Sequence, residues 1–263
     1  MDMFTYKNLT KKIAMLFVLS ILFISNSNAQ ADSLYSQILK GNKAYTESEF
    51  ENAVYIYEQV LKSGYTSGEL YYNLGNAYYR KGDYTSAILN YERALLLSPN
   101  DEDILTNLDF SRNHLQDRIE EIPDFFLVGW FKTFSNLFSA KMWATISIVS
   151  FILFLAFAGL FLFSRTIAIR KLTFIFSIII LFNSAISFVG GYIQNRKQTK
   201  HIEAIVFSPS VIVKSAPSDS GTDLFIIHEG LKVRIRDVDN GWKEIQLSDG
   251  KIGWLSEDTI VEI

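Results

Sequence analysis

Side chains able to carry out chemistry are few in this 263-residue chain, and they are scattered. The three histidines, His114, His201 and His228, are isolated in the sequence and form no HExxH motif or triad-like arrangement. Cysteine is absent, which excludes disulfides, thiol nucleophiles and cysteine-ligated metals. Because the sequence also contains no Walker loop and no dinucleotide fingerprint, we expect no enzyme, no catalytic residue, no metal site and no cofactor.

Asparagines at a regular interval are the residues best suited to recognition. Asn42 and Asn76 are 34 residues apart, and Asn73 and Asn107 have the same separation. An amide side chain donates and accepts hydrogen bonds at once, which suits binding of an extended peptide backbone. The alternative is that these amides are solvated or bridge neighbouring helices. The net charge of −3 gives no electrostatic reason to expect a nucleic-acid partner.

The same interval relates two longer segments that must position these asparagines. The residues that repeat identically are Gly41/Gly75, Asn42/Asn76, Tyr45/Tyr79, Ala53/Ala87, Tyr57/Tyr91, Glu58/Glu92 and Leu61/Leu95. A period of this length predicts helix–turn–helix units that cannot bury their apolar faces alone. We expect Gly75 and Ala87 to be small because two helices cross there, and Pro99 to stop the second helix. Gly82-Asp83 is expected to form the sharp turn between the helices.

Residues 68–101 resemble a tetratricopeptide repeat, with signature positions occupied by Leu74, Gly75, Tyr78, Ala87, Tyr91, Ala94 and Pro99. Residues 34–67 fit the pattern more loosely. The segment after residue 101, with Leu105, Leu108, Phe110 and Leu115, is expected to form a covering helix, so residues 32–121 comprise two repeats plus a capping helix. The resemblance implies a concave peptide-binding groove lined by Asn42, Asn73, Asn76 and Asn107.

The N-terminus has the pattern of an export signal over residues 1–31. Lysines precede an apolar run over residues 13–24, which is too short to cross a hydrocarbon core of about 30 Å as a helix. Small residues follow, with Ser27-Asn28-Ala29 and Ala29-Gln30-Ala31 as alternative cleavage sites. The other interpretation is an uncleaved N-terminal anchor. Under both interpretations, the repeats that follow are exported from the cytoplasm.

Two apolar segments, residues 142–163 and 172–193, are each long enough to cross a bilayer. The linker between them, residues 164–171, contains Arg165, Arg170 and Lys171, which favours a cytoplasmic location. We therefore predict a transmembrane hairpin with both flanking domains on the periplasmic side of the inner membrane. Neither span contains an ionisable residue, which argues against ion transport.

Two features suggest how this membrane region packs. Asn183, Ser184 and Ser187, followed by Gly190-Gly191, allow close helix approach, either within the hairpin or onto another membrane protein. Residues 122–141 are predicted to form an interfacial aromatic helix with its apolar side in the lipid headgroup region. The alternative is packing on a partner or on the repeats. The residues at helical spacing are Phe126, Trp130, Phe134, Leu137, Phe138 and Lys141.

The pattern changes to short alternating strands over residues 203–263. Asn240-Gly241 and Asp249-Gly250 are hairpin-turn signals. We expect strands at Ile205–Phe207, Val211–Lys214, Leu224–Ile227, Lys232–Val238, Trp242–Leu247, Lys251–Leu255 and Thr259–Ile263. The segment resembles a bacterial SH3-like domain through Gly241-Trp242, Gly250, Gly253-Trp254 and Leu255. Trp242 and Trp254 are either core residues or a ligand surface, and the resemblance implies binding of peptides or peptidoglycan.

The order of these parts resembles the BatE-type family of Bacteroidetes aerotolerance-operon proteins. The expected fold is a multidomain membrane protein with an all-α tetratricopeptide array, a transmembrane helical hairpin and a C-terminal all-β SH3-like barrel. The resemblance implies a non-enzymatic scaffold in an aerotolerance or envelope-stress complex. Its implied partners are von Willebrand A-domain proteins, a MoxR-type ATPase and the lipid bilayer. The alternative function is a cell-wall or peptide-sensing module that the hairpin anchors.

Overall fold

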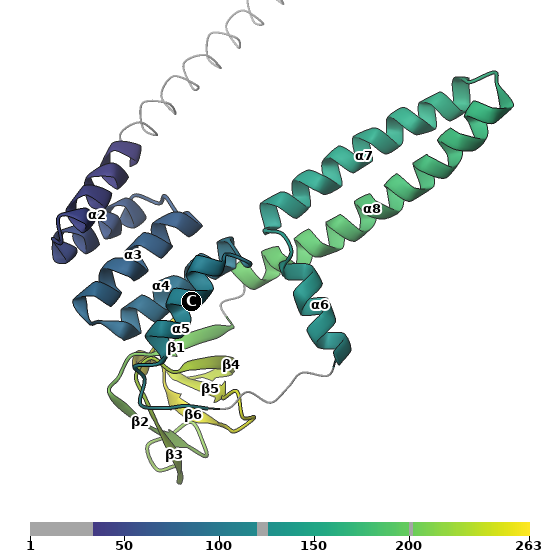
Figure 1. The fold of residues 1–263 in the computed structure, drawn as a ribbon. Coiled ribbons are helices and arrows are strands. Elements are labelled where there is room, and N and C mark those ends of the chain that lie inside the picture. The colour runs from purple at the N-terminus through teal and green to yellow at the C-terminus, as the bar shows by residue number, and fades with distance from the viewer. Residues whose placement is uncertain (1–33, 120–125, 200–201) are drawn as a thin grey trace, which may run out of the picture. The chain divides into compact units, whose positions relative to one another are not determined.

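The computed structural model describes residues 34–119, 126–199 and 202–263 (Figure 1). The chain forms two compact units, Met1–Thr66 and Ser67–Ile263, and each is described by itself. The predicted export signal, residues 1–31, lies outside the described residues.

The first unit contains a helix over residues 34–46 and the helix α2, Phe50–Lys62. A β-carbon placed on Gly41 would lie 2.5 Å from Cε1 of Tyr57, so only glycine lets these two helices approach this closely. The first repeat therefore forms the helix pair that the period predicts. The face of α2 that is buried consists of Ala53, Val54, Tyr57 and Val60.

The second unit begins with the equivalent pair, α3 (Gly68–Lys81) and α4 (Tyr84–Leu97). Gly82 ends α3 with φ of 81°, a left-handed conformation that favours glycine, and Asp83 caps α4 by accepting a hydrogen bond from the Ser86 N–H. The predicted turn at Gly82-Asp83 is therefore confirmed. α4 ends two residues before Pro99, as expected for a residue that lacks the amide hydrogen.

Packing within this second pair follows the predicted pattern. A β-carbon on Gly75 would lie 2.7 Å from Cε1 of Tyr91, which matches the relation between Gly41 and Tyr57 in the first unit. Ala87 and Ala94 are fully buried, and Leu74 is nearly so. The small residues are thus where the two helices are closest, and the tyrosine fills the space beside them.

The helix after the second repeat, α5 (Glu102–Arg112), uses a different face from the one expected. Ile104, Leu108 and Ser111 are buried, at a spacing that places them on one side of a helix. The predicted covering residues Leu105 and Phe110 are instead 46% and 54% exposed. A helix therefore follows the second repeat and packs against α4, but the assignment of these two residues to its buried face is wrong.

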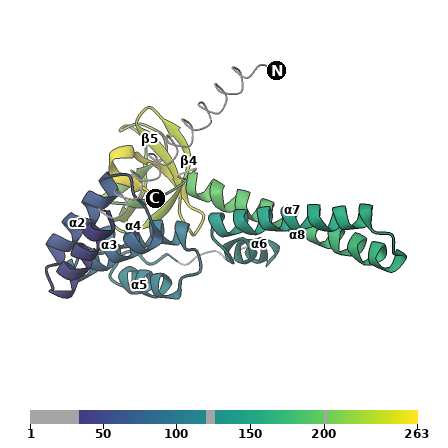
Figure 2. The ribbon, with the colours of Figure 1, turned by 90° about the horizontal axis from the view of Figure 1, so that it is seen from above.

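Two long apolar helices, α7 (Ala140–Phe163) and α8 (Ile167–Thr199), run side by side and antiparallel (Figures 1 and 2). Both are long and apolar enough to cross a membrane. α8 starts earlier and ends later than the predicted span, so Arg170 and Lys171 of the expected linker lie in its first turns. The helix continues through these polar residues because this stretch contains no proline or glycine, the two residues that most disfavour a helix.

Polar groups inside the hairpin bond to each other. The Ser147 hydroxyl lies 3.0 Å from the carbonyl of Ser184, and the Ser184 hydroxyl lies 2.9 Å from the carbonyl of Ser147. The Asn183 amide donates to the Ser150 hydroxyl. Trp143 packs on Gly190, where a β-carbon would lie 2.9 Å from the indole ring. The small and polar residues thus pack within the hairpin, which is one of the two predicted alternatives.

The aromatic helix before the hairpin ends earlier than expected. α6 runs over Phe126–Asn136, and the chain then turns before Ser139 caps α7. Residues 122–125 of the predicted interfacial segment lie outside the described residues, and Lys141 belongs to α7 rather than to the aromatic helix. The Trp143 indole N–H donates to the Ser135 carbonyl, which ties α6 to the hairpin.

The C-terminal part is a seven-stranded antiparallel sheet. Its strand order is β3-β2-β6-β5-β4-β1-β7, so the strand pairs form an open sheet, and closure into a barrel stays a prediction. The strands are β1 (Glu203–Val206), β2 (Ser210–Lys214), β3 (Asp223–His228), β4 (Lys232–Asp239), β5 (Trp242–Gln246), β6 (Ile252–Ser256) and β7 (Ile260–Glu262). All seven lie close to the predicted positions. Asn240, Gly241 and Gly250 have positive φ, so both predicted hairpin turns are confirmed.

Candidate functional site

An identical hydrogen bond occurs in each repeat and involves two of the predicted groove residues. The Tyr57 hydroxyl donates to Oδ1 of Asn42 at 2.7 Å in the first unit. The Tyr91 hydroxyl donates to Oδ1 of Asn76 at 2.7 Å in the second. In both repeats the amide carbonyl of the asparagine therefore fixes the tyrosine that packs against the glycine.

A second contact continues this polar row onto α5. Nδ2 of Asn107 lies 2.9 Å from Oδ1 of Asn76 and 3.0 Å from the Tyr72 hydroxyl. Asn73, one turn before Asn76, is half-buried on the same side of α3. We call Asn73, Asn76 and Asn107 the asparagine face of the second unit. Because two donors already occupy the Asn76 carbonyl, this amide would contact a peptide mainly through its nitrogen.

The second repeat is also bonded directly to the sheet, through an ionic network that sequence reasoning missed. The buried carboxylate of Glu92, on α4, lies 2.6 Å from Arg112 and 2.8 Å from the ammonium group of Lys232. Lys232, at the start of β4, also lies 2.8 Å from Oε2 of Glu203 on β1. One network of two carboxylates and two cations therefore joins α4, α5 and two strands.

The charges in this network stabilise one another. Burial disfavours the charged form of Lys232, but the carboxylates of Glu92 and Glu203 outweigh it and raise the Lys232 pKa above its ordinary value of 10.5. For Glu203 burial acts in the opposite direction, yet the positive charges led by Lys232 lower its pKa below 4.5. Both groups are therefore charged at neutral pH, and the network holds three ion pairs, Arg112–Glu92, Lys232–Glu92 and Lys232–Glu203.

Apolar and backbone contacts accompany these ion pairs. Ile205 of β1 and the C-terminal Ile263 belong to the same buried cluster as Ile88, Tyr91 and other α4 residues. The guanidinium of Arg93 donates to the Glu262 carbonyl at 2.7 Å, and burial lowers the pKa of Arg93. The sheet and the second repeat thus share one core.

Residues 113–119, which follow α5, lie across the sheet. Asp117 accepts from the His228 backbone N–H at 2.6 Å, and its other oxygen lies 2.9 Å from Nδ1 of the His228 ring. Leu115 packs closely on Gly230, and Ile119 packs against the apolar core of the sheet. The sequence, in which His228 stands isolated, gives no sign of this carboxylate partner, and His201 lies outside the described residues.

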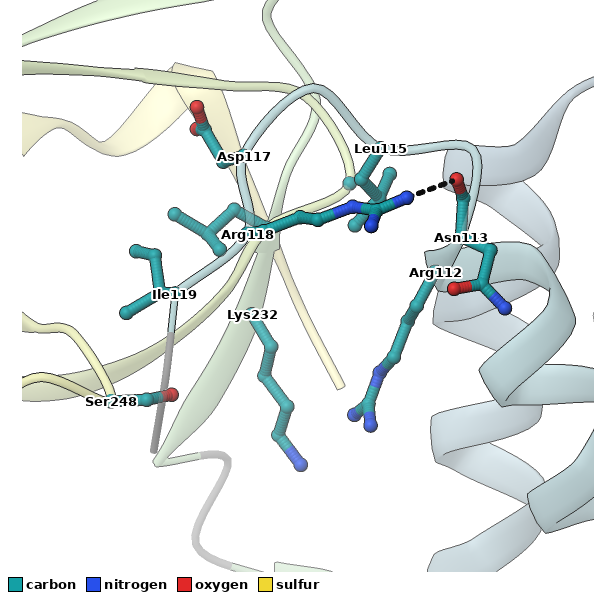
Figure 3. A pocket seen from close by; sticks show the side chains of 10 residues that line it. Arg112, Asn113, Leu115, Asp117, Arg118, Ile119, Lys232 and Ser248 are labelled. Atoms are coloured by element: carbon teal, nitrogen blue, oxygen red, sulfur yellow. Dashed lines mark hydrogen bonds between the residues drawn. The ribbon is translucent and has the colours of Figure 1, made fainter. Parts of the chain in front are cut away.

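A hollow of about 360 Å³ lies between residues 112–119 and the start of β4 (Figure 3). Its polar lining includes Arg112, Arg118, Lys232 and Ser248, and its apolar lining includes Leu115, Ile119 and Leu231. Within the described residues, no group of three or more acidic or histidine side chains is arranged to hold a metal ion.

The two tryptophans proposed as an SH3-like surface are half-buried and do not belong to the apolar core of the sheet. Trp242 pairs with Ser256, and Trp254 pairs with Glu244, so both tryptophans point to the same side of neighbouring strands. The buried residues Ile245 and Leu255 alternate with them and point to the other side. Exposed apolar side chains on the tryptophan side include Ile212 and Ile226, which are cross-strand partners.

The fold and these contacts define a helical-repeat protein whose repeat is fused to a β-sheet and to two apolar helices. Residues 68–101 match the tetratricopeptide repeat family, which covers the second helix pair. Tetratricopeptide repeats are typically non-catalytic modules for protein–protein interaction, so this part of the chain indicates a protein partner. No curated protein matches the chain.

Sequence reasoning identified the asparagines but gave no separate role to Glu92, Lys232, Asp117 or His228. Glu92 repeats Glu58 at the common period, which marks a shared helical position but specifies no partner on the sheet. Lys232 stands at the start of a predicted alternating strand, and this position by itself specifies no partner either.

Proposed function

We propose that this protein is a non-enzymatic scaffold of the bacterial inner membrane that presents its repeat and SH3-like sheet to protein partners in the periplasm. The observation that carries this proposal is the direct bonding of a tetratricopeptide repeat to both the sheet and α8. The Glu92 network provides the first connection. The amide of Gln198, near the end of α8, donates to the Leu96 carbonyl at 2.6 Å and provides the second.

The exposure of the apolar helices supports membrane insertion. Phe163 and Phe182 are 87% and 69% exposed, which a helix in the core of a water-soluble domain would not tolerate. At about 1.5 Å per residue, the 24 residues of α7 extend about 36 Å and exceed a hydrocarbon core of about 30 Å. The 33 residues of α8 extend about 50 Å, so its last turns reach beyond the bilayer to the repeat.

The aromatic helix α6 supports placement of this unit directly at the bilayer surface. Trp130 and Phe131 are 62% and 58% exposed, and few charges occur along the helix. Amphipathic aromatic side chains favour the headgroup region, where one end of the ring is hydrated. Gln194 and Lys197 of α8 bond to Asn136 at the end of α6 and would hold the aromatic helix beside the exit of the second span.

The proposed partners are inferred from the resemblance of the whole order of domains to the BatE-type family, and no single site identifies them. In this proposal the asparagine face of the second unit binds an extended segment of another protein. Asn42 is a separate candidate recognition residue of the first unit. The family resemblance favours membrane-bound von Willebrand A-domain proteins and a MoxR-type ATPase system as the surrounding complex. The function would then be assembly during aerotolerance or envelope stress.

Membrane topology is the first test of this proposal. Alkaline phosphatase fused after Ile263 is expected to be active, because the enzyme requires export. The matched control is the same reporter inserted after Thr166, between the two apolar helices, where it should be inactive. Activity only at the second position, or protection of the sheet from protease in spheroplasts, would refute the scaffold on the periplasmic side.

Binding is the second test. The full chain, crosslinked in native membranes and purified in detergent, should recover specific protein neighbours. Asn73→Ala is expected to reduce that recovery several-fold, whereas Asn52→Ala, at an exposed position of α2, should have no effect. Recovery of the chain alone, or equal recovery with both variants, would contradict the role of the asparagine face.

A second candidate function is peptide or cell-wall binding by the sheet. Trp242 and Trp254 on one side of the sheet, next to exposed Ile212 and Ile226, favour this candidate because aromatic surfaces bind flat or apolar groups. The full chain in detergent would be incubated with purified peptidoglycan and sedimented. Retention that Trp254→Ala abolishes and Lys43→Ala preserves would support the candidate, and a lack of retention would exclude it.

A further inference from the structure

A polar side chain stands at the centre of the second apolar helix. Asn183 of α8 is exposed, whereas the next residue, Ser184, is buried against α7. At about 1.5 Å per residue, Asn183 lies about 15 Å from either end of the predicted span, residues 172–193. A hydrocarbon core is about 30 Å thick, so this amide would lie at the depth where water is scarcest. This depth applies if the two helices are inserted in a membrane, as proposed above.

Only part of the hydrogen-bonding capacity of this amide is used. Nδ2 of Asn183 donates to the Ser150 hydroxyl of α7 at 2.9 Å, which fixes the orientation of the side chain. A carboxamide carries two amide protons and a carbonyl oxygen that accepts two hydrogen bonds. Within the described residues, no hydrogen bond ends on Oδ1 of Asn183, and the second amide proton has no acceptor. One donor and the whole acceptor therefore remain available.

The serines beside this asparagine need no further partner. Ser147 and Ser184 each donate to the carbonyl of the other, across the two helices. In water the exposed side of Asn183 would be hydrated, but lipid tails offer neither a donor nor an acceptor. An unpaired amide in hydrocarbon is costly, and polar side chains in membranes therefore bond across helices. The free side of Asn183 thus indicates a protein contact at this depth.

The surface around Asn183 is apolar. Ile179 and Ile186, one turn before and one turn after it on the same side of α8, are 56% and 38% exposed. Neither predicted span contains an ionisable residue that could select a charged partner. A partner must therefore present a donor and an acceptor together, at the same depth, within an apolar surface.

A second copy of this chain meets these requirements. Copies inserted with the same orientation hold Asn183 at the same depth. A primary amide is self-complementary, because its free N–H and its carbonyl pair with the carbonyl and the N–H of another amide. A twofold axis along the bilayer normal produces this reciprocal contact, in which both copies use the same patch. A different membrane protein would need a polar group of the matching kind at this one depth.

We propose that two copies of this protein associate in the bilayer through reciprocal hydrogen bonds between their Asn183 amides. Ile179 and Ile186 of the two copies pack on either side of the amide pair and exclude lipid. Ser150 holds each amide in place through the remaining proton. The contact does not involve the asparagine face, so the dimer and the binding of a peptide by the repeat are independent.

Co-purification of two tagged forms of the full chain tests this contact. A His-tagged and a FLAG-tagged chain are expressed together, the membranes are washed with alkaline carbonate, and the detergent extract is purified on the His tag. The FLAG-tagged copy should be recovered. Asn183→Leu in both forms, which keeps a branched side chain but removes the amide, should lower that recovery at least fivefold. Leu181→Ala is the matched control, because Leu181 is exposed and lies about 160° around α8 from Asn183, and it should leave the recovery unchanged.

Cysteine crosslinking tests the same contact with the native asparagine in place, since the chain contains no natural cysteine. Oxidation in membranes should link two copies of Ile186→Cys but not two copies of Leu181→Cys, although the two positions are similarly exposed, at 38% and 41%. Adding Asn183→Leu to Ile186→Cys should reduce the linked dimer at least fivefold. Cysteines that replace Ser147 and Ser184 in the Asn183→Leu variant should still form a disulfide within one chain, which would show that its hairpin is intact.

Unchanged recovery with Asn183→Leu, absence of the FLAG-tagged copy, or equal crosslinking of Ile186→Cys and Leu181→Cys would each overturn the amide pair. Recovery of a different protein that Asn183→Leu removes, with no second copy, would assign the surface to that protein and would also overturn it. A chain that resists the carbonate wash but gives one of these results would leave the membrane insertion standing. Release of the chain by carbonate would overturn the insertion and the amide pair together.

Discussion

The ammonium group of Lys232 lies 2.8 Å from the carboxylate of Glu92, although 140 residues separate the two in the sequence. Glu92 belongs to the tetratricopeptide repeat and Lys232 to the sheet, so the pair joins two folds that often occur as separate modules. The Glu92 side chain is only 6% exposed, and removing one of its partners would leave a buried charge. The sheet is therefore an integral part of the second unit rather than a tethered domain.

Replacing Glu92 is expected to destabilise the protein far more than replacing a glutamate of an exposed ion pair. Glu92→Gln removes the charge that Arg112 and Lys232 share, and we expect a loss of about 2 kcal/mol, reduced from the usual range because both cations are partly exposed. Glu47→Gln removes an exposed pair with Lys43 and should cost less than about 0.5 kcal/mol. Denaturant unfolding of both variants in the same detergent measures the difference.

Equal effects at these two positions would contradict the docking of the sheet on the repeat. A complementary observation comes from limited proteolysis, which should release residues 203–263 more readily from Glu92→Gln than from Glu47→Gln. Similar release from both variants would mean that the ionic network does not hold the sheet.

The same network predicts a pH dependence of stability. The folded pKa of Glu203 is below its ordinary value of 4.5, so its contribution is present above that pH and is lost as the pH falls through the folded pKa. The folded pKa of Lys232 is above 10.5, so its contribution is present below that pH and is lost as the pH rises through the folded pKa. We expect a plateau of stability between these limits.

Thermal unfolding of the unmodified chain and of Glu203→Gln, recorded across the acid range, checks this dependence. The variant should be less stable at pH 7, and the difference in Tm between the two proteins should shrink as the pH falls below 4.5. A constant difference across the acid range would show that the Glu203 carboxylate does not interact with Lys232 as the geometry indicates.

A glycine-to-alanine change should lower the free energy of unfolding at one helical site and should not lower it at another. Alanine normally stabilises a helix by about 0.5–1 kcal/mol relative to glycine. At Gly75 its methyl group would lie 2.7 Å from the Tyr91 ring, so we expect destabilisation of about 2 kcal/mol. At Gly129 of α6 no atom lies within 4 Å of the added carbon, and the change should be neutral or stabilising. Denaturant unfolding monitored by circular dichroism gives both values.

Local features of this fold could be predicted from sequence because short segments determine them. The turns at Gly82-Asp83 and Asn240-Gly241 follow from the backbone angles that glycine and asparagine adopt readily. The relation of Gly75 to Tyr91 follows from the period, since the same pair recurs as Gly41 and Tyr57. The strand positions follow from alternation with a period of two.

Contacts between distant segments could not be predicted in this way. Asp117 and His228 are 111 residues apart, and their hydrogen bonds exist only because residues 113–119 cross the sheet. On α5 the apolar residues Leu105 and Phe110 suggested one buried face, but docking against α4 selects Ile104 and Leu108. Helical periodicity indicates that an apolar face exists, whereas the partner determines which of two overlapping faces is buried.

The apolar hairpin offers a crosslinking test, because the chain contains no natural cysteine. The hydroxyl oxygens of Ser147 and Ser184 lie 3.4 Å apart, so cysteines at both positions should form a disulfide within one chain. The control pairs Ser147→Cys with Phe182→Cys, because Phe182 is exposed away from the other helix. After oxidation in membranes and denaturation in sodium dodecyl sulfate, the first pair should resist labelling by a polyethylene-glycol maleimide, and the second should be labelled at both thiols. Labelling of both pairs, or a crosslinked dimer from the first, would show that the serines contact a second protein rather than each other.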